Sequence, residues 1–339
     1  MAELKEKYGF PLFTRNESLV YLGHERKLII SDIWAFWDYV IKKKNRNKKF
    51  LQSLLEQAKN FYVAAEQAPL KSKPLLFYYS FLNLSKIALS FEHGYTDTND
   101  FIHGISERNN QTFQTSDITL QPITRPGRVK VASEIYELFY GQTINANTTI
   151  NLKDLLSHCV GVHRAYSEIY RIPEVFCKLS ELEYYRNGMT IGFKALIQCS
   201  DAELTELQNR GYTTETVGGR HFLKEELLTT RYNPAREDYY NLSRKIINKG
   251  IWYYIGNKGH TMYLSTQQDH RYPTEMTIYW TIFYLGSITR YRPNLFDEIF
   301  SDTEQWLMSE FLATQPKQFL YLMTAKMLGQ KVLKAYSKI

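Results

Sequence analysis

Six polar residues in two separated blocks of the sequence have side chains that could bind an anion. They are Asn83, Lys86, His103, Arg108, Arg290 and Arg292. Ammonium and guanidinium groups form charge-assisted hydrogen bonds with phosphate and carboxylate oxygens, and a guanidinium can donate two parallel bonds. If the two blocks meet in the fold, these residues predict a pocket for a phosphate-bearing or carboxylate ligand.

Several of these residues also have a purely structural interpretation. Lys86 lies in an apolar helical segment, from which its long side chain could reach solvent. His103 precedes Gly104 and could cap a turn in the core. Arg290 lies at an expected helix end before Pro293, where a cation complements the helix dipole. The sequence leaves both interpretations open.

The basic run KKKNRNKK at residues 42–49 is a second candidate binding region, for nucleic acid. Its lysines are Lys42, Lys43, Lys44, Lys48 and Lys49. Lysine ammonium groups neutralise phosphates without reading the base sequence, so such binding would weaken steeply with salt. Short charge runs more often form a solvated turn between helices, and this interpretation stands beside the first.

The composition indicates a folded cytoplasmic protein. Of its 339 residues, 44% are hydrophobic and 23% are charged, which excludes a disordered chain. The three cysteines, Cys159, Cys177 and Cys199, have no paired spacing, which fits a reducing compartment. The charged N-terminus and the lack of a long apolar run predict neither a signal peptide nor a membrane span. A net charge of +7 allows a nucleic-acid partner without requiring one.

The sequence lacks the motifs of several common enzyme classes. It contains no Gly-rich phosphate loop, no dinucleotide-binding glycine motif and no nucleophile elbow, and its few acid-x-Lys pairs lie too near the N-terminus for a restriction-type nuclease. The histidines and cysteines lack zinc-site spacing, and Asp97 and Asp100 lack the loop of a calcium site. We therefore expect no metal and no cofactor.

Helical patterns dominate both ends of the sequence, and alternating patterns dominate the middle. Helices are expected at residues 30–62, interrupted by the basic run, and at 75–91, 152–173, 276–291, 295–312 and 319–336, with Asp32 and Asn151 as N-caps. Strands are expected within residues 117–139, on both sides of a short helix between 189 and 228, and as a hairpin at 252–266.

These elements predict an α+β fold that is mostly helical, with β-containing middle segments between helical ends. We expect an N-terminal helical part at residues 1–94, a mixed region at 95–270 and a C-terminal helical part at 271–339. The C-terminal helices are expected to pack on the N-terminal ones as one compact unit.

Two blocks of the sequence resemble the YaaC-like proteins of bacteria. The first is FYVAAEQAPLKSKPLLFYYSFLNLSKIAL at residues 61–89, followed by IHGIS at 102–106 and Arg108. The second is LGSITRYRPNLFDEIF at 285–300, followed by FLATQPKQFLYLM. Here Ile87 stands before Ala88, where the family often has Lys-Ala directly. The resemblance implies bacterial origin, cytoplasmic residence and the length of a single module, and it brings no reaction, cofactor or catalytic residue.

The leading functional hypothesis is a binding or interaction module, associated with nucleic acid in a bacterial stress or phage-defence system. Its basis is a basic chain with 26 tyrosines, whose rings and hydroxyls suit bases and phosphates. One alternative is a metal-independent enzyme, ribonuclease-like or acting on a phosphate-bearing ligand, that uses His103 with nearby Arg or Lys. Another is a subunit of a protein assembly. The expected partners are nucleic acid or protein and not a membrane, and a homo-oligomer stays open.

Overall fold

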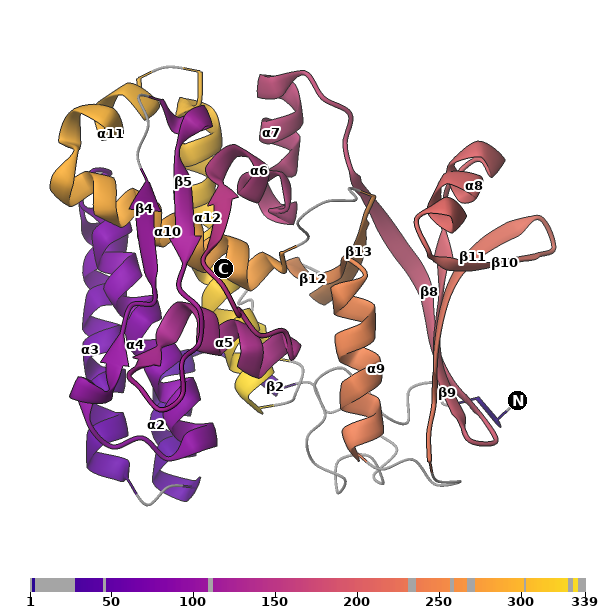
Figure 1. Ribbon diagram of the computed structural model, residues 1–339, viewed down its shortest axis with the longest axis horizontal. Coiled ribbons are helices and arrows are strands. Elements are labelled where there is room, and N and C mark those ends of the chain that lie inside the picture. The colour runs from indigo at the N-terminus through magenta and orange to yellow at the C-terminus, as the bar shows by residue number, and fades with distance from the viewer. Residues whose placement is uncertain are drawn as a thin grey trace. The chain divides into compact units, whose positions relative to one another are not determined.

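The chain forms two compact units, each built from separate stretches of sequence (Figure 1). The computed structural model describes residues 2–3, 28–44, 47–108, 112–230, 236–256, 259–266, 272–301, 303–328 and 332–334. The helical unit comprises Ile30–Pro173 and Thr274–Leu320. The sheet unit comprises Met1–Ile29, Glu174–Pro273 and Tyr321–Ile339. The expected division into three consecutive parts stays a prediction.

Long helices form most of the helical unit. They are α2 (Ile33–Lys44), α3 (Lys48–Gln67), α4 (Lys73–His93), α5 (Val131–Tyr140), α6 (Leu152–Ser157), α7 (His163–Tyr170), α10 (Thr274–Tyr291), α11 (Pro293–Ile299) and most of α12 (Gln305–Leu328). Short 3₁₀ turns occur at Thr98–Asp100, Phe113–Thr115 and Val160–Val162.

Two small sheets complete the helical unit. The first contains β4 (Ile105–Arg108), β5 (Asp117–Leu120) and β7 (Thr148–Asn151), all antiparallel. The second pairs β3 (Phe101–Ile102) with β6 (Val129–Lys130) in parallel. These strands lie in sequence between α4 and α6.

Helices α4 and α10 form the core of the helical unit. Helix α10 is buried on every side from Thr274 to Ile288, and the expected core helix at 75–91 is confirmed as α4. Gly286 of α10 permits their close contact, because a Cβ there would lie only 3.3 Å from the Cα of Leu75. The ring of Tyr78 stacks on that of Tyr279 with 6.1 Å between centroids. Leu75 belongs to the first family-like block and Gly286 to the second, so the two blocks meet in the core.

The predicted helix N-caps are confirmed. The Asp32 carboxylate accepts hydrogen bonds from the backbone amides of Trp34 and Ala35, both at 3.0 Å. The Asn151 side chain accepts from the amides of Lys153 and Asp154 at the start of α6. Each side chain satisfies amides that have no partner within the helix.

The strand prediction is wrong for the end of the 117–139 segment, where α5 forms instead. Val131, Ile135 and Phe139 recur every four residues and are all buried, which is a helical period. Glu134 accepts a bond of 3.1 Å from the Lys130 amide and so caps the first turn. The expected helix at 152–173 is divided, because a 3₁₀ turn at Val160–Val162 separates α6 from α7.

The predicted break at Pro316 is also wrong, because α12 continues through this residue. Proline removes one backbone donor from a helix interior and normally kinks or ends the helix. Here Phe311, Leu312, Phe319 and Leu320 are all buried on either side of it. We infer that this packing outweighs the lost hydrogen bond. Helix α12 ends at Leu328.

The sheet unit contains one large antiparallel sheet. Its strand order is β10 (Thr213–Val217), β11 (Arg220–Leu228), β9 (Thr190–Ile197), β8 (Phe176–Asn187), β13 (Gly259–Ser265) and β12 (Ile251–Gly256), and β1 (Ala2–Glu3) also pairs with β8. Helices α8 (Asp201–Asn209) and α9 (Arg236–Asn248) belong to this unit, and β2 (Leu28–Ile30) pairs with β14 (Val332–Lys334).

The sheet unit confirms the predicted strand, helix, strand order and the hairpin. Ser200 and Glu203 form a capping box at the start of α8, with the Glu203 carboxylate 2.7 Å from the Ser200 amide. Together with the helical unit, this sheet confirms the α+β fold class. None of the helices in the described ranges has the length and apolar character that a bilayer crossing requires.

Candidate functional site

The packing of α4 on α10 brings Arg290 to the surface of α4. The Arg290 guanidinium donates one hydrogen bond of 3.0 Å to the Tyr79 hydroxyl and another of 2.5 Å to the hydroxyl of Tyr291. Tyr291 is 63% exposed, so the guanidinium lies at the edge of the unit. A cation from the second family-like block is thus fixed beside a tyrosine from the first.

The loop between β3 and β4 holds His103 in a fixed place. The His103 carbonyl accepts a bond of 3.0 Å from the Ala132 amide at the start of α5. Gly104, the next residue, has φ of +71°, and a Cβ there would lie 2.7 Å from the Cβ of Lys130. Only glycine fits this conformation and this spacing. The sequence His-Gly is therefore explained by the close approach of this loop to β6.

The His103 ring is oriented by a buried tyrosine. Its Nδ1 forms a short hydrogen bond with the hydroxyl of Tyr78, a residue of α4 that is almost completely buried. Burial is the largest of the effects that raise the pKa of Tyr78 well above its ordinary value. The phenol therefore keeps its proton and can donate it to Nδ1. In the neutral imidazole the ring proton then lies on Nε2, which is bonded to none of the described residues.

Lys86 lies two turns along α4 from Tyr78 and is half-buried. Its ammonium lies 5.8 Å from the ring centroid of Phe101, a contact that supplies weak cation–π attraction. Burial lowers the pKa of Lys86. Within the described part of the chain, no carboxylate forms an ion pair with Lys86 or with Arg290.

Lys86, His103 and Arg290 form one group of interacting charges, which we call the cation cluster. The pKa of His103 is lowered by burial first, and then by the positive charges of Lys86 and Arg290. Both cations therefore act on the same imidazole. An anion bound near this imidazole would offset the effect of the two positive charges.

The other three anion-site candidates do not join the cation cluster. Asn83 is buried against α3, where its side-chain amide donates a 3.3 Å bond to Gln57. Arg108 is exposed at the far end of β4, about 16 Å along the chain from His103. Arg292 is exposed and its charge acts on Tyr284, not on His103. The structure thus brings together Lys86, His103 and Arg290 and leaves Asn83, Arg108 and Arg292 apart.

The basic run covers the end of α2 and the start of α3, and its residues 45–46 lie outside the described residues. The Lys42 ammonium pairs with Asp38 one helical turn earlier, at 2.5 Å. The Lys43 ammonium lies 5.7 Å from the centroid of the exposed Tyr39 ring. Lys48 and Lys49 are exposed at the start of α3, and the side chain of Lys44 lies outside the described residues. The exposure of Lys42, Lys43, Lys48 and Lys49 agrees with the interpretation that the run is solvated.

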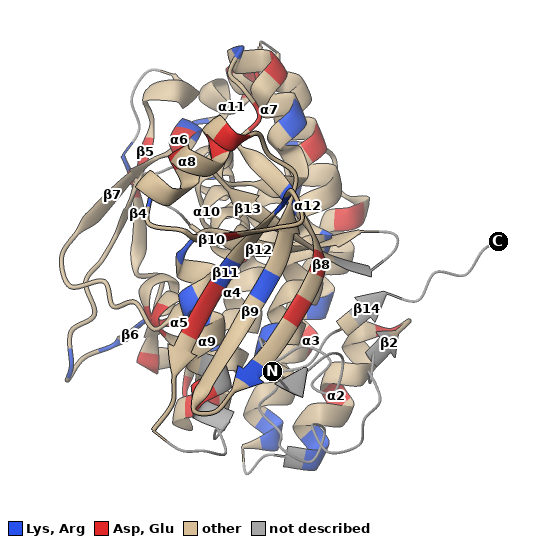
Figure 2. Cartoon of the chain, turned by 90° about the vertical axis from the view of Figure 1, so that its right-hand side faces the viewer, with Lys and Arg blue, Asp and Glu red and all other residues tan. Residues whose placement is uncertain are grey.

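The charges of the sheet unit differ from those of the cation cluster because they are paired. Figure 2 shows both signs interspersed along β8, β9 and β11. Two ion pairs join these strands and their neighbour β10, Lys194 with Glu215 and Arg220 with Glu181, and a third, Lys224 with Glu226, lies within β11. Since the charges largely cancel, these strands present no extended surface of one sign.

Sequence reasoning missed the two tyrosines that hold the cluster. Tyr78 orients His103 and Tyr79 accepts from Arg290. Their signal is the Tyr-Tyr pair in the first family-like block, where one ring faces the core and the next faces the surface. In a helix with apolar residues on nearly all sides, sequence alone does not show which tyrosine hydroxyl meets a polar partner.

Comparisons with known proteins support the family resemblance. The family model described as YaaC-like Protein matches residues 24–327, which is nearly the whole chain. This match includes every residue of the cation cluster and of the basic run. Neither the curated proteins nor the solved structures contain a match to this chain.

Proposed function

The chain belongs to the YaaC-like family, and we propose that it is a cytoplasmic bacterial binding protein whose cation cluster holds the phosphate group of a ligand. The observation that supports this proposal is that two cations, Lys86 and Arg290, act on one imidazole, His103, while the described residues pair no carboxylate with any of the three. A half-buried cation without a counter-charge costs folding free energy. Such a cost is often retained at sites that bind an opposite charge.

The arrangement favours a phosphate over a carboxylate. Lys86 and Arg290 together carry two positive charges when both are protonated, and a neutral His103 contributes an Nε2–H donor. A phosphate monoester near neutral pH carries up to two negative charges and three terminal oxygens, so it matches the cluster in charge and in the number of acceptors. A carboxylate has one charge and two oxygens. We therefore choose inorganic phosphate and a nucleoside monophosphate as probes, and we expect acetate to bind more weakly than either.

Binding fits the surroundings of His103 better than acid–base catalysis does. No carboxylate among the described residues contacts its ring, and Nδ1 is occupied by the Tyr78 hydroxyl. In a common catalytic arrangement a carboxylate stabilises the imidazolium, and His103 has no such partner among the described residues. The alternatives of a metal-independent enzyme and of an assembly subunit stay predictions.

Calorimetric titration of the full chain with inorganic phosphate and with the nucleoside monophosphate tests the proposal. We expect Lys86→Gln and Arg290→Gln each to weaken phosphate binding by about tenfold, because each removes one charge-assisted bond. Lys49→Gln is the matched control, since it removes an exposed charge of the same sign on the neighbouring helix.

A double-mutant cycle on His103→Gln and Arg290→Gln gives a second readout. Residues of one network should be non-additive by about 0.5 to 3 kcal/mol in binding free energy. No binding of any phosphate probe, or equal binding by Lys86→Gln, Arg290→Gln and the control Lys49→Gln, would overturn the proposal.

Nucleic acid bound at the basic run is a second candidate function. It is favoured by the exposed Lys43, Lys48 and Lys49, and by the 57% exposed ring of Tyr39, which Lys43 contacts. Exposed lysines and an aromatic face are the groups that single strands use for backbone and base contacts. The stress or phage-defence setting stays a prediction.

A further inference from the structure

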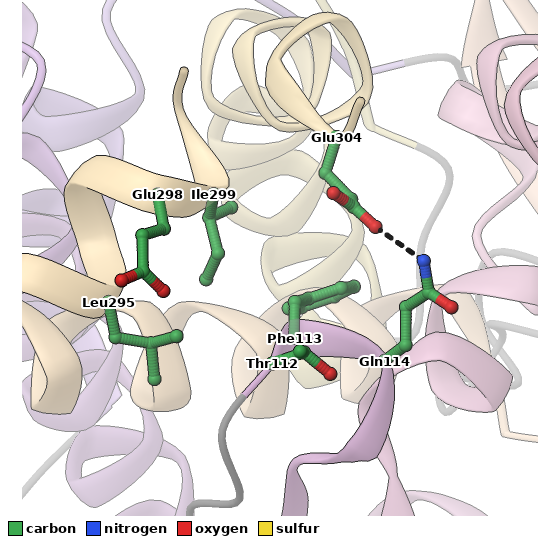
Figure 3. A pocket seen from close by; sticks show the side chains of 7 residues that line it. All are labelled: Thr112, Phe113, Gln114, Leu295, Glu298, Ile299 and Glu304. Atoms are coloured by element: carbon green, nitrogen blue, oxygen red, sulfur yellow. Dashed lines mark hydrogen bonds between the residues drawn. The ribbon is translucent and has the colours of Figure 1, made fainter. Parts of the chain in front are cut away.

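A separate pocket in the helical unit has acidic and apolar walls (Figure 3). Its volume is about 220 Å³. The lining residues come from the segment before β5, from α11 and from the turn before α12: Thr112, Phe113, Gln114, Leu295, Glu298, Ile299 and Glu304. The pocket shares no residue with the cation cluster or with the basic run.

Glu304 is an acid buried without a counter-charge. Its side chain belongs to a residue that is only 6% exposed, and it forms no ion pair within the described part of the chain. One carboxylate oxygen, Oε1, accepts bonds from the Gln114 amide at 3.0 Å and from the Tyr170 hydroxyl at 3.2 Å. Both donors are neutral, so the negative charge is solvated but not compensated.

The second carboxylate oxygen of Glu304 is available to a ligand. No hydrogen bond to Oε2 exists among the described residues. Figure 3 shows this oxygen turned away from Gln114, toward the side of the pocket that α11 forms. Burial, together with the Glu304 charge, raises the pKa of Tyr170, so this phenol keeps its proton and continues to donate to Oε1.

Glu298 adds a second negative charge on the α11 side of the pocket. It is exposed and has no ion-pair partner within the described ranges, whereas its neighbour Asp297 pairs with Lys71 at 2.5 Å. The pocket floor consists of the apolar side chains of Phe113, Leu295 and Ile299, which are all buried. Two acids over an apolar floor suit a cation that carries carbon atoms.

We propose that this pocket binds an alkylammonium or guanidinium group. Glu304 Oε2 accepts its hydrogen bond, Glu298 supplies the second negative charge, and the alkyl carbons lie on Phe113, Leu295 and Ile299. A bare divalent cation fits less well, since it prefers six or more oxygen ligands and this pocket offers two carboxylates beside apolar side chains. Among the described residues, no group of three or more metal-binding side chains lies together.

The same chemistry has two sources, a free amine and a lysine or arginine side chain of another protein. We would titrate the full chain with butylammonium, with a short blocked peptide that contains one lysine, and with neutral 1-butanol. Tight binding of butylammonium alone would identify a small-molecule site, and preference for the peptide would identify a protein contact. The expected result is binding of at least one cationic probe and no binding of 1-butanol.

Three substitutions test the assigned roles. We expect Glu304→Gln to weaken binding of the cationic probe by about tenfold and Glu298→Gln by about threefold, in line with the loss of a buried and of an exposed charge partner. Glu310→Gln is the matched control, because Glu310 is exposed on α12 and lines no part of the pocket. Unchanged binding is expected for it.

Thermal melts of each variant accompany these titrations. If Glu304→Gln unfolds the chain, the exposed Glu298 still tests the proposal. No binding of either cationic probe to the wild-type chain, or equal binding by Glu298→Gln and Glu310→Gln, would overturn it. The phosphate titrations are independent of this result, since the two sites share no residue.

Discussion

The cation cluster and the basic run carry the same charge sign on neighbouring elements, but their surroundings differ. In the basic run, Lys42 pairs with an acid one turn earlier, and Lys48 and Lys49 are exposed to water. In the cation cluster, Lys86 is half-buried and no described carboxylate pairs with it. Exposed charges contribute little free energy because water already solvates them. A binding site is therefore marked less by the number of cations than by their burial without counter-charges.

Both regions contact the same helix, which makes their comparison direct. The Asn47 side chain, at the start of α3, lies 3.5 Å from the carbonyl of Gly94, the C-cap of α4. Lys86 lies eight residues before Gly94, or about 12 Å along the helix axis. Substitutions near either end of this segment can thus be compared within one element.

The largest expected difference concerns two glycines with positive φ. Gly104→Ala should lower the free energy of unfolding by about 3 kcal/mol, because alanine meets both the φ penalty and the overlap with Lys130. It should also remove phosphate binding by displacing His103. Gly94→Ala, beside the basic run, has open space around its Cβ and should cost only about 1 kcal/mol. Urea unfolding measures both.

If Gly104→Ala and Gly94→Ala lowered the free energy of unfolding equally, this result would contradict the tight contact that positions His103. Phosphate titration of folded Gly94→Ala supplies the control, since its affinity should match that of the wild-type chain.

A second difference is expected for lysine replacement by methionine. Lys86→Met should lower phosphate affinity by about tenfold and raise stability by about 0.5 kcal/mol, because it removes a half-buried charge without a partner. Lys49→Met should change neither property, since Lys49 is exposed. Loss of stability in Lys86→Met would show that its ammonium makes a structural contribution instead.

The smallest effect is expected from the basic run. If Lys43, Lys48 and Lys49 contact nucleic-acid phosphates, replacing all three by Gln should reduce the slope of log affinity against log salt by up to about 2 for a single strand. Lys86→Gln should leave this slope unchanged. A single-stranded probe in fluorescence anisotropy at several salt concentrations measures it, and a slope that responds only to Lys86→Gln would reverse the two assignments.

Local sequence patterns predicted most helices, the strands around the short helix between 189 and 228 and the hairpin at 252–266, but not strand β8, because apolar spacing and caps such as Asp32 act over a few residues. They were wrong at residues 131–140, where a helical spacing of Val131, Ile135 and Phe139 follows an alternating segment, and at Pro316, where burial on both sides outweighs the missing donor. The discontinuous units arise from contacts between distant segments, which no local pattern contains.

The candidate site was predictable in part. Lys86, His103 and Arg290 were identifiable as polar residues in apolar blocks, and the pairing of the blocks followed only if α4 met α10. Tyr78 was not identifiable, because a tyrosine among many aromatic residues shows its hydrogen-bond partner only in three dimensions.

The acidic pocket gave no signal in the sequence. Glu298 and Glu304 are ordinary acids near helix ends, and only the fold shows that one of them is buried without a cation. The same holds for Asn83, whose polar head in an apolar helix indicated a ligand but whose partner is Gln57 of α3.

The most direct test of the central claim is an NMR titration of His103, assigned by loss of its signal in His103→Gln. Without an anion, its pKa should lie below the ordinary value, because burial and the charges of Lys86 and Arg290 disfavour the imidazolium. Phosphate bound among these cations favours the imidazolium, so saturating phosphate should move the midpoint to higher pH, while chloride at equal ionic strength should not. A midpoint at the ordinary value that phosphate leaves unchanged would contradict the cation cluster.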